Sequence, residues 1–512
     1  MDSLVDLVRE STARFAERDA YLFKPGIRTQ RYRFSDVWEI SGRVAGYLRS
    51  RGIDQGDRVL FWAPNTPEWP LAFLGCLRLG AVAVPLDVRS TPEFVNNIAA
   101  QTQPKLACVS RFTPGRESLT GVPILDLNDL RTAVAGASPT PAPVKLTHDD
   151  LAEVMFTSGT TGNPKGVMLS HGNILANVDQ SKDMLPGDFH HQTLSLLPLS
   201  HMLEQTGGLF VGLLHGATVT FPVSRQPAIL IKTMAERHIT TMLVVPQALV
   251  LFMNAIEREL ARAGREAMWR RMQDLAGHLP LEARRWLFRP VLARFGGALR
   301  YMACGGAYLD PAVGEKWERM GVLILQGYGA TEASPVIANN THREHRLDAL
   351  GKVVPGLELR IAGDGEILVR GPNITRGYWN NEEATRAAFE DGWYKTGDLG
   401  QVDAQGWLYF KGRKKDLIVL SNGQNVFPED IENALKRQPG VKEAPVVGLD
   451  REGGAVEVHA VLLLEAGTDA AAVVRAANRE LASHQQVQGF TVWPHDDLPR
   501  THTLKVKKHE LL

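Results

Sequence analysis

The strongest chemical signal in the sequence is the run Phe156-Thr-Ser-Gly-Thr-Thr-Gly-Asn-Pro-Lys-Gly166. Its small residues let backbone N–H groups approach a polyphosphate closely, its hydroxyls add hydrogen-bond donors, and its single lysine neutralises negative charge. The run is not a Walker A loop, because that pattern needs GxxxxGK followed by Ser or Thr, and here Lys165 precedes Gly166. It therefore predicts a phosphate-binding loop. The alternative, a Ser/Thr/Gly-rich turn between strands at 153–156 and 167–170, would account for a shorter run.

Before this loop, amphipathic helical stretches alternate with short β-branched or aromatic runs. The helical stretches are 34–51 and 93–101, and the strand-like runs are 58–62 and 81–86. This alternation is typical of an α/β fold.

From about Trp407 the pattern changes. Strands are predicted at 407–411, 417–420 and 456–464, and helices at 428–436 and 470–482. This order predicts a small α+β module of about 100 residues, a usual domain size. The charged, Gly-containing stretch 411–416 lies at its junction with the larger part and suits a hinge.

Composition excludes several classes of protein. The 512 residues carry 57 Lys and Arg against 57 Asp and Glu, which leaves no global field to collect nucleic acid. The three cysteines cannot form a disulfide framework and lie in no metal-ligand spacing. The acidic N-terminus is unlike a signal peptide, and the apolar stretch 207–223 is interrupted by His215 and Gly216. We therefore expect a cytoplasmic protein that does not cross a membrane.

Between residues 256 and 300 a long helical segment carries ten Arg against five acids, with aromatic and aliphatic residues interleaved. A basic, aromatic-bearing helix can rest on an anionic lipid surface, which would make the protein peripheral at a membrane. The alternative is a solvated helical face that packs on its own domain.

Five motifs in a fixed order resemble the adenylate-forming superfamily, which includes acyl-CoA synthetases, adenylation domains of peptide synthetases and luciferases. They are 156–166, Gln326-Gly-Tyr-Gly-Ala-Thr-Glu-Ala-Ser334, Tyr394-Lys-Thr-Gly-Asp-Leu399, Gly412-Arg-Lys-Lys-Asp416 and Leu498-Pro-Arg-Thr-His-Thr-Leu-Lys505. The resemblance implies a large multi-subdomain N-terminal α/β domain over residues 1–413. It also implies a small mobile C-terminal α+β domain over 414–512, with a hinge at Lys415.

The resemblance implies a nucleotide site for ATP. The implied nucleotide-binding residues are Thr157, Ser158, Gly159, Thr160, Thr161, Gly162, Lys165, Gly305, Gly306, Ala307, Tyr328, Thr331, Asp398 and Arg413. The residue types suit these roles, because Tyr328 offers a flat face for adenine and Asp398 can accept hydrogen bonds from both ribose hydroxyls. Taken alone, Asp398 and Arg413 would be read as a structural ion pair.

The implied catalytic residues are Lys505, His201, Thr331 and Glu332, and Glu332 is also the implied Mg²⁺ ligand. A carboxylate that attacks the α-phosphate brings two anions together, and the Lys505 ammonium would offset that repulsion. The alternatives are a surface acid for Glu332, a core histidine for His201 and a solvated lysine for Lys505. Gly423 lies in the implied channel for the thiol of coenzyme A; a carrier protein could be the acceptor instead.

Three features resemble the long-chain branch of the acyl-CoA synthetases. They are His201-Met-Leu-Glu204, Thr503-Leu-Lys505 and the helical insertion before Gly305. We therefore expect a fatty acid substrate, with a medium-chain or aryl acid as the alternative. The segments 205–221 and 242–252 would line an acyl tunnel or, equally, form ordinary core. A rival of another class is a catalytically silent nucleotide-binding or acyl-binding protein.

Overall fold

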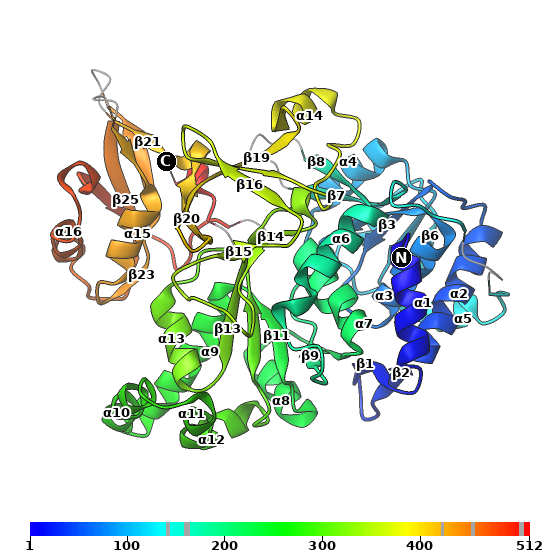
Figure 1. The fold of residues 1–512 in the computed structure, drawn as a ribbon, viewed down its shortest axis with the longest axis horizontal. Coiled ribbons are helices and arrows are strands. Elements are labelled where there is room, and N and C mark those ends of the chain that lie inside the picture. The colour runs from blue at the N-terminus through cyan, green and yellow to red at the C-terminus, as the bar shows by residue number, and fades with distance from the viewer. Residues whose placement is uncertain (140–143, 158–163, 421–423, 452–455, 501–505, 512) are drawn as a thin grey trace. The chain divides into compact units, whose positions relative to one another are not determined.

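The structure is a computed structural model that describes residues 1–139, 144–157, 164–420, 424–451, 456–500 and 506–511. The chain forms two compact units, Met1–Glu358 with Arg370–Gly392 (unit 1) and Leu359–Val369 with Trp393–Leu512 (unit 2). Figure 1 labels the helices and strands. The predicted fold class, a large N-terminal α/β part and a smaller C-terminal α+β part, is confirmed. The domain boundary between residues 413 and 414 and the mobility of the small domain stay predictions.

The first sheet of unit 1 has the strand order β6-β5-β3-β4-β7-β8, and only β7 and β8 run antiparallel. Its strands are β3 (Arg58–Trp62), β4 (Val82–Leu86), β5 (Leu106–Val109), β6 (Ile124–Asp126), β7 (Leu151–Thr157) and β8 (Lys165–Ser170). Because β4 and β7 are parallel, Asp87 and Thr157 leave the sheet at the same edge, where ligands bind in open α/β sheets.

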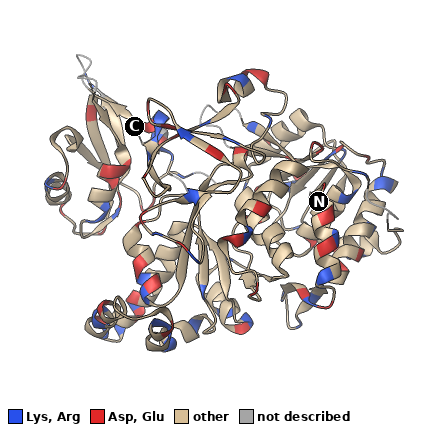
Figure 2. Cartoon of the chain, viewed as in Figure 1, with Lys and Arg blue, Asp and Glu red and all other residues tan. Residues whose placement is uncertain are grey.

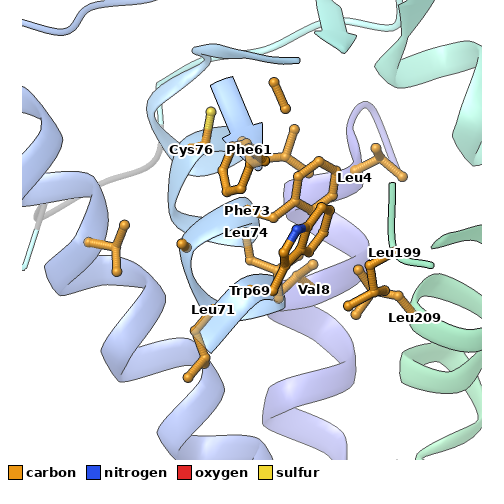
Figure 3. Close-up of a cluster of buried hydrophobic side chains, with 14 of the residues drawn as sticks. Leu4, Val8, Phe61, Trp69, Leu71, Phe73, Leu74, Cys76, Leu199 and Leu209 are labelled. Atoms are coloured by element: carbon orange, nitrogen blue, oxygen red, sulfur yellow. The ribbon is translucent and has the colours of Figure 1, made fainter. Parts of the chain in front are cut away.

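The helix α3 (Glu68–Leu79) is buried on all sides from Trp69 to Leu79, which fits its almost entirely apolar sequence. It packs against α1 (Leu4–Arg14) and α2 (Phe34–Ser50). Figure 3 shows Trp69 and Phe73 meeting Phe61 of β3, with ring centroids 5.3 and 5.9 Å from Phe61. These contacts fix the first sheet to its helical layer. The remaining helices of this half are α4 (Pro92–Thr102), α5 (Leu130–Val134) and α6 (His171–Ser181).

The second sheet of unit 1 runs in the order β15-β14-β13-β12-β11-β9-β10-β1-β2. The strands from β13 to β1 are parallel, and β2, β14 and β15 are antiparallel to their neighbours. Its strands are β1 (Asp19–Phe23), β2 (Gln30–Arg33), β9 (Gln192–Leu194), β10 (Thr218–Phe221), β11 (Thr241–Val244), β12 (Tyr301–Cys304), β13 (Leu323–Gly329), β14 (Val336–Asn339) and β15 (Gly351–Val353).

The helices of this part of unit 1 are α7 (Val211–His215), α8 (Pro227–Arg237), α9 (Pro246–Arg262), α10 (Glu266–Ala276), α11 (Leu281–Leu287), α12 (Arg289–Leu292) and α13 (Pro311–Arg319). The segment 256–300, predicted as one long helical stretch, is divided among the end of α9 and the helices α10, α11 and α12. Trp269 and Phe288 are buried and pack edge to face at 5.4 Å. Those two aromatics therefore belong to the core, whereas Trp286 is 76% exposed.

Unit 2 contains two main sheets and a short hairpin. The first sheet has the order β16-β17-β19-β20, with β16 (Glu358–Ile361), β17 (Glu366–Arg370), β19 (Trp393–Val402) and β20 (Trp407–Arg413). The second contains β23 (Val441–Glu443), β24 (Val446–Asp450), β25 (Val456–Leu464) and β26 (Gly489–Val492). The hairpin is β21 (Ile418–Val419) with β22 (Asn425–Val426). The helices α15 (Pro428–Lys436) and α16 (Ala470–Asn478) pack against each other.

The helix predicted at 470–482 is too long by one turn, because α16 ends at Asn478. The Asn478 side chain donates to the Val487 carbonyl at 3.0 Å and accepts from the Val487 N–H at 2.9 Å. This contact turns the chain away from the helix axis.

Among the described residues, no helix is both long and apolar enough to span a bilayer.

Glu153, on β7, is fully buried in the core of unit 1. Burial raises the pKa of its carboxyl group to about 8, and the nearby Gln205 amide, which favours the carboxylate, does not offset that effect. A raised folded-state pKa means that the unfolded state releases its proton first as the pH rises. The stability that Glu153 costs the folded state therefore grows from about pH 4.5 to about pH 8. It is on the order of 3 kcal/mol at pH 7.

We predict that Glu153→Gln removes this pH-dependent cost, because the amide is neutral at every pH in this range. The stability gain over the wild-type chain should be larger at pH 8 than at pH 5. Thermal unfolding of both proteins at the two pH values measures it. An equal difference in melting temperature at both values would show that Glu153 does not titrate with a raised pKa.

Candidate active site

The predicted phosphate-binding loop connects the antiparallel strands β7 and β8, which pair Thr157 with Lys165. The predicted residues Ser158, Gly159, Thr160, Thr161 and Gly162 lie outside the described residues. Thr157 and Lys165 form the described base of the loop, where the Thr157 hydroxyl lies 3.5 Å from the Lys165 carbonyl. The Lys165 ammonium lies 5.2 Å from the centre of the Tyr378 ring, a cation–π distance.

A segment far along the chain, residues 375–379, runs beside β8; we name it the bridging segment. The Met168 N–H donates to the Gly377 carbonyl at 3.0 Å, and the Trp379 N–H donates to the Gly166 carbonyl at 2.7 Å. The Thr375 hydroxyl donates to the Met168 carbonyl at 2.6 Å. These bonds fix the bridging segment against the strand that follows the loop.

The same segment holds the turn that carries Thr331 and Glu332. This short 3-10 turn, Thr331–Ala333, connects β13 and β14. The Thr375 N–H donates to the Glu332 carbonyl at 2.8 Å, and the Tyr378 hydroxyl donates to Glu332 Oε1 at 2.9 Å. Lys165 therefore lies over the ring of Tyr378, and Glu332 accepts a hydrogen bond from the hydroxyl of the same tyrosine, although 166 residues separate Lys165 from Glu332.

The turn after β13 returns so tightly that Gly329 has no room for a side chain. A Cβ atom at Gly329 would lie 1.8 Å from the Pro335 carbonyl oxygen. The Ala330 N–H donates to that same carbonyl at 2.9 Å. Glycine is therefore required at the entry to the turn that positions Glu332.

Gly305, Gly306, Ala307 and Tyr328 lie at the carboxyl ends of β12 and β13. These two strands are parallel, with Cys304 opposite Gln326. Gly305 is buried, and a Cβ atom there would lie 3.3 Å from the Gly327 carbonyl oxygen; Gly306 has a φ of +83°. The structure thus gathers a wall poor in side chains and the half-buried Tyr328 at one sheet edge, as the sequence predicts.

His201 belongs to a charged cluster that sequence reasoning missed in part. Its Nε2 lies 3.4 Å from Asp87 Oδ2, a carboxylate that is only 5% exposed. Arg89 donates to both Asp87 oxygens, from Nε at 3.0 Å and from Nη2 at 2.8 Å. Burial would raise the pKa of Asp87, but the His201 ring and the Arg89 guanidinium hold it far below its usual range. Asp87 is therefore a buried anion that lies within ion-pair distance of the His201 ring.

Glu204, the last residue of the stretch His201-Met-Leu-Glu204, is buried and begins a π-helical segment, Glu204–Phe210. Burial raises its pKa to about 7, and the Ser195 hydroxyl only partly offsets that rise. Asn65 donates to Ser195 Oγ at 2.8 Å and to the Leu197 carbonyl at 2.7 Å. Asn65 follows β3 and Ser195 follows β9, so this amide joins the two sheets of unit 1 beside the histidine.

In unit 2, Asp398 and Arg413 lie opposite each other on β19 and β20, with Arg413 Nε 3.3 Å from Asp398 Oδ1. The ion pair that the sequence suggests is thus present, and Asp398 is largely buried. Lys415 lies in the exposed turn Lys414–Asp416 directly after β20. Lys505 and Gly423 lie outside the described residues.

Tyr378 and Asp87 are the two site residues that sequence reasoning missed. Asp87 follows the run at 81–86 that reads as a strand, and a polar residue at the carboxyl end of a buried strand is a usable signal. Tyr378 gave only a weak signal, a glycine followed by two aromatic residues. Across the described ranges, no three His, Cys, Asp or Glu side chains gather to hold a metal. A cation at Glu332 would need further ligands from a bound phosphate.

The chain is similar to known proteins over most of its length. The family model for "AMP-binding enzyme" matches residues 8–379, and the model for "AMP-binding enzyme C-terminal domain" matches residues 430–505. A long-chain-fatty-acid–CoA ligase of Mycobacterium bovis is 34% identical over 441 residues, which cover 78% of this chain and 72% of the relative. An indoleacetate–CoA ligase of Aromatoleum aromaticum is 29% identical and covers 92% of this chain and 90% of its own.

The solved structure of o-succinylbenzoate CoA synthetase from Bacillus subtilis, in complex with its acyl-adenylate intermediate, is also similar. It superposes with a TM-score of 0.83 at 25% identity and covers 99% of this chain and 97% of its own. The similarity therefore extends over nearly the whole chain.

We predict that Gly329→Ala disrupts the turn at Thr331–Ala333, because the new methyl group meets a backbone carbonyl that cannot move away cheaply. The expected loss is about 2–3 kcal/mol of stability, as for other overpacked sites. Gly327→Ala is the matched control, since its Cβ would meet the nearest atom at 3.7 Å. Thermal unfolding of both variants measures the effect, and equal melting temperatures would contradict the proposed tightness of the turn.

Proposed function

The chain belongs to the AMP-binding enzyme family, and we propose that it activates a carboxylic acid with ATP and transfers the acyl group to coenzyme A. The observation that carries this proposal is the grouping of Lys165 and Glu332 around Tyr378. A cation and a carboxylate fixed beside a hydroxyl-rich and glycine-rich loop suit a magnesium-bound polyphosphate. The related CoA ligases and the acyl-adenylate complex support the reaction class.

In the first step a carboxylate oxygen of the acid attacks the α-phosphorus of ATP, and the bond from that phosphorus to the pyrophosphate oxygen breaks. Thr157, Lys165 and the loop residues 158–162 hold the departing pyrophosphate, and Thr331 donates to the α-phosphate. Lys505 offsets the repulsion between the two reacting anions. Bound Mg²⁺ neutralises phosphate charge, and Glu332 is the residue that would hold it.

In this proposal the adenine and the ribose of the nucleotide are recognised by different groups of residues. Gly305, Gly306 and Ala307 flank the adenine on one side and Tyr328 on the other. Asp398, kept in place by Arg413, accepts hydrogen bonds from the ribose hydroxyls. Each role follows from the residue type: a flat ring, a wall without side chains and a carboxylate that is already oriented.

In the second step the sulfur of coenzyme A attacks the acyl carbonyl carbon, and AMP leaves with the oxygen that came from the acid. The small domain rotates about Lys415 between the two steps, withdraws Lys505 and brings the loop at Gly423 to the thiol. A carrier protein could deliver the same pantetheine thiol.

For the acid we propose a fatty acid, long-chain by preference. Two observations support this substrate class. They are the stretch His201-Met-Leu-Glu204, whose histidine lies beside Asp87, and the 34% identity to a long-chain-fatty-acid–CoA ligase. The alternative is an aryl acid or a medium-chain acid, favoured by the relative that acts on indoleacetate and aligns over 92% of this chain.

Pyrophosphate release tests the proposed function, measured with acids from acetate through long fatty acids to benzoate and indoleacetate. Each acid is assayed with and without coenzyme A. We expect turnover to be highest with a long fatty acid and to require coenzyme A. Release that ignores coenzyme A would leave only the adenylation step, and release that is highest with an aryl acid would assign the chain to the alternative substrate class.

We predict that Tyr378→Phe raises the Mg²⁺ concentration for half-maximal adenylation about tenfold, as for other losses of a hydrogen bond to a metal ligand. The variant keeps the ring for Lys165 and removes only the hydroxyl that orients Glu332. Tyr32→Phe is the matched control, because Tyr32 donates to Glu68 at the same distance, 2.9 Å, outside the proposed site. An unchanged Mg²⁺ dependence in Tyr378→Phe would contradict the role of Glu332.

A further inference from the structure

The helices α9 to α12 carry more positive charge than the acidic residues that the structure describes around them neutralise. Four of the five acids between residues 256 and 300 are already paired: Glu257 with Lys316, Glu259 with Arg294, Asp274 with Arg319 and Glu282 with Arg300. Six exposed arginines form no ion pair with any residue that the structure describes. We name them the basic helical surface: Arg258, Arg262, Arg265, Arg270, Arg271 and Arg289. Only Glu266 remains to balance them.

On α9 and α10 the arginines lie on the exposed face of each helix, opposite the face that packs into the core. On α9, Phe252 and Ile256 pack into the core, whereas Arg258 and Arg262 follow Leu251 along the exposed face at helical spacing. Figure 1 shows α10, α11 and α12 following one another, and Figure 2 shows Lys and Arg in blue along these helices. The charge is therefore presented outward.

Large apolar side chains are exposed among these arginines. Met268 and Leu275 lie on the exposed face of α10 together with Arg271, and they are 48% and 54% exposed. Trp286, on α11 and three residues before Arg289, is 76% exposed. Helix α10 contacts α11, so both helices contribute to one region. An exposed face that mixes cations with Trp, Leu and Met has the composition of helices that lie in a membrane interface.

We propose that the basic helical surface docks on an anionic lipid bilayer. The guanidinium groups pair with lipid phosphates, while Met268, Leu275 and Trp286 enter the region between headgroups and acyl chains. The whole chain has zero formal charge, so the attraction comes from this surface and weakens with salt. The apolar side chains distinguish a bilayer from a nucleic acid, which would need only the cations. This proposal does not depend on the proposed enzymatic function.

Sedimentation of the full-length protein with vesicles tests the proposal. We expect binding to vesicles that contain phosphatidylglycerol at low salt, release at high salt, and little binding to pure phosphatidylcholine. Absence of binding to the anionic vesicles at low salt would overturn the proposal, and so would equal binding to both lipids.

Two variants assign the binding to this surface. The triple change Arg262→Glu, Arg265→Glu and Arg271→Glu should weaken vesicle binding at least about tenfold, since each basic residue near a membrane adds about 1 kcal/mol. The matched control reverses three exposed arginines elsewhere in unit 1 that form no ion pair with a described residue: Arg28→Glu, Arg343→Glu and Arg386→Glu. Equal loss in the control would mean that net charge alone is responsible and would overturn the proposal.

The double change Leu275→Ser and Trp286→Ser tests the apolar contribution and keeps every charge. It should weaken vesicle binding and leave the binding of soluble RNA unchanged. If RNA binds the wild-type chain more tightly than the vesicles do, and the double change affects neither, the surface would be a nucleic-acid site instead.

Discussion

The site depends on one constraint, the hydrogen bonds that hold the bridging segment, residues 375–379, between β8 and the turn at Thr331–Ala333. On one side the segment pairs with Gly166 and Met168; on the other it bonds to the backbone and the side chain of Glu332. Strand β8 and the turn after β13 belong to different sheets of unit 1. The bridging segment bonds to both, and Tyr378 contacts Lys165 on β8 and Glu332 in the turn. One neutral side chain, Tyr378, therefore contacts both a cation and an anion of the proposed site.

Polar groups in the interior of unit 1 either find partners or cost stability. Asp87 stays anionic although it is buried, because Arg89 donates to both of its oxygens, and it lies 3.4 Å from the His201 ring nitrogen. Asn65 joins the two sheets beside that histidine. Glu153 forms no ion pair with a residue that the structure describes, and burial raises its pKa. The favourable contacts that offset such costs come from the apolar layer around α3, where Trp69, Phe61 and Phe73 pack.

Local pattern predicted the elements well where packing agrees with it. The helix at 428–436 and the strands at 58–62 and 456–464 begin and end as predicted. The helix predicted at 470–482 stops early because Asn478 bonds to Val487, a contact that no local pattern contains. The motifs predicted Lys165, Glu332 and Tyr328 as site residues. They did not predict Tyr378 or Asp87, because the partners of these two residues, Glu332 and His201, are distant in the chain. The roles of all the predicted site residues stay predictions, and Lys505, Gly423 and residues 158–162 also lie outside the described residues.

In the proposed first step the acid's own carboxylate oxygen attacks the α-phosphorus of ATP. The most direct measurement is the fate of oxygen-18 carried in the carboxylate of the acid substrate, followed by mass spectrometry of the products. The account predicts one labelled oxygen in each AMP and none in pyrophosphate, because the thiol displaces AMP together with the oxygen that formed the anhydride. Label in inorganic phosphate, with ADP as the nucleotide product, would show attack at the terminal phosphorus and would contradict the account.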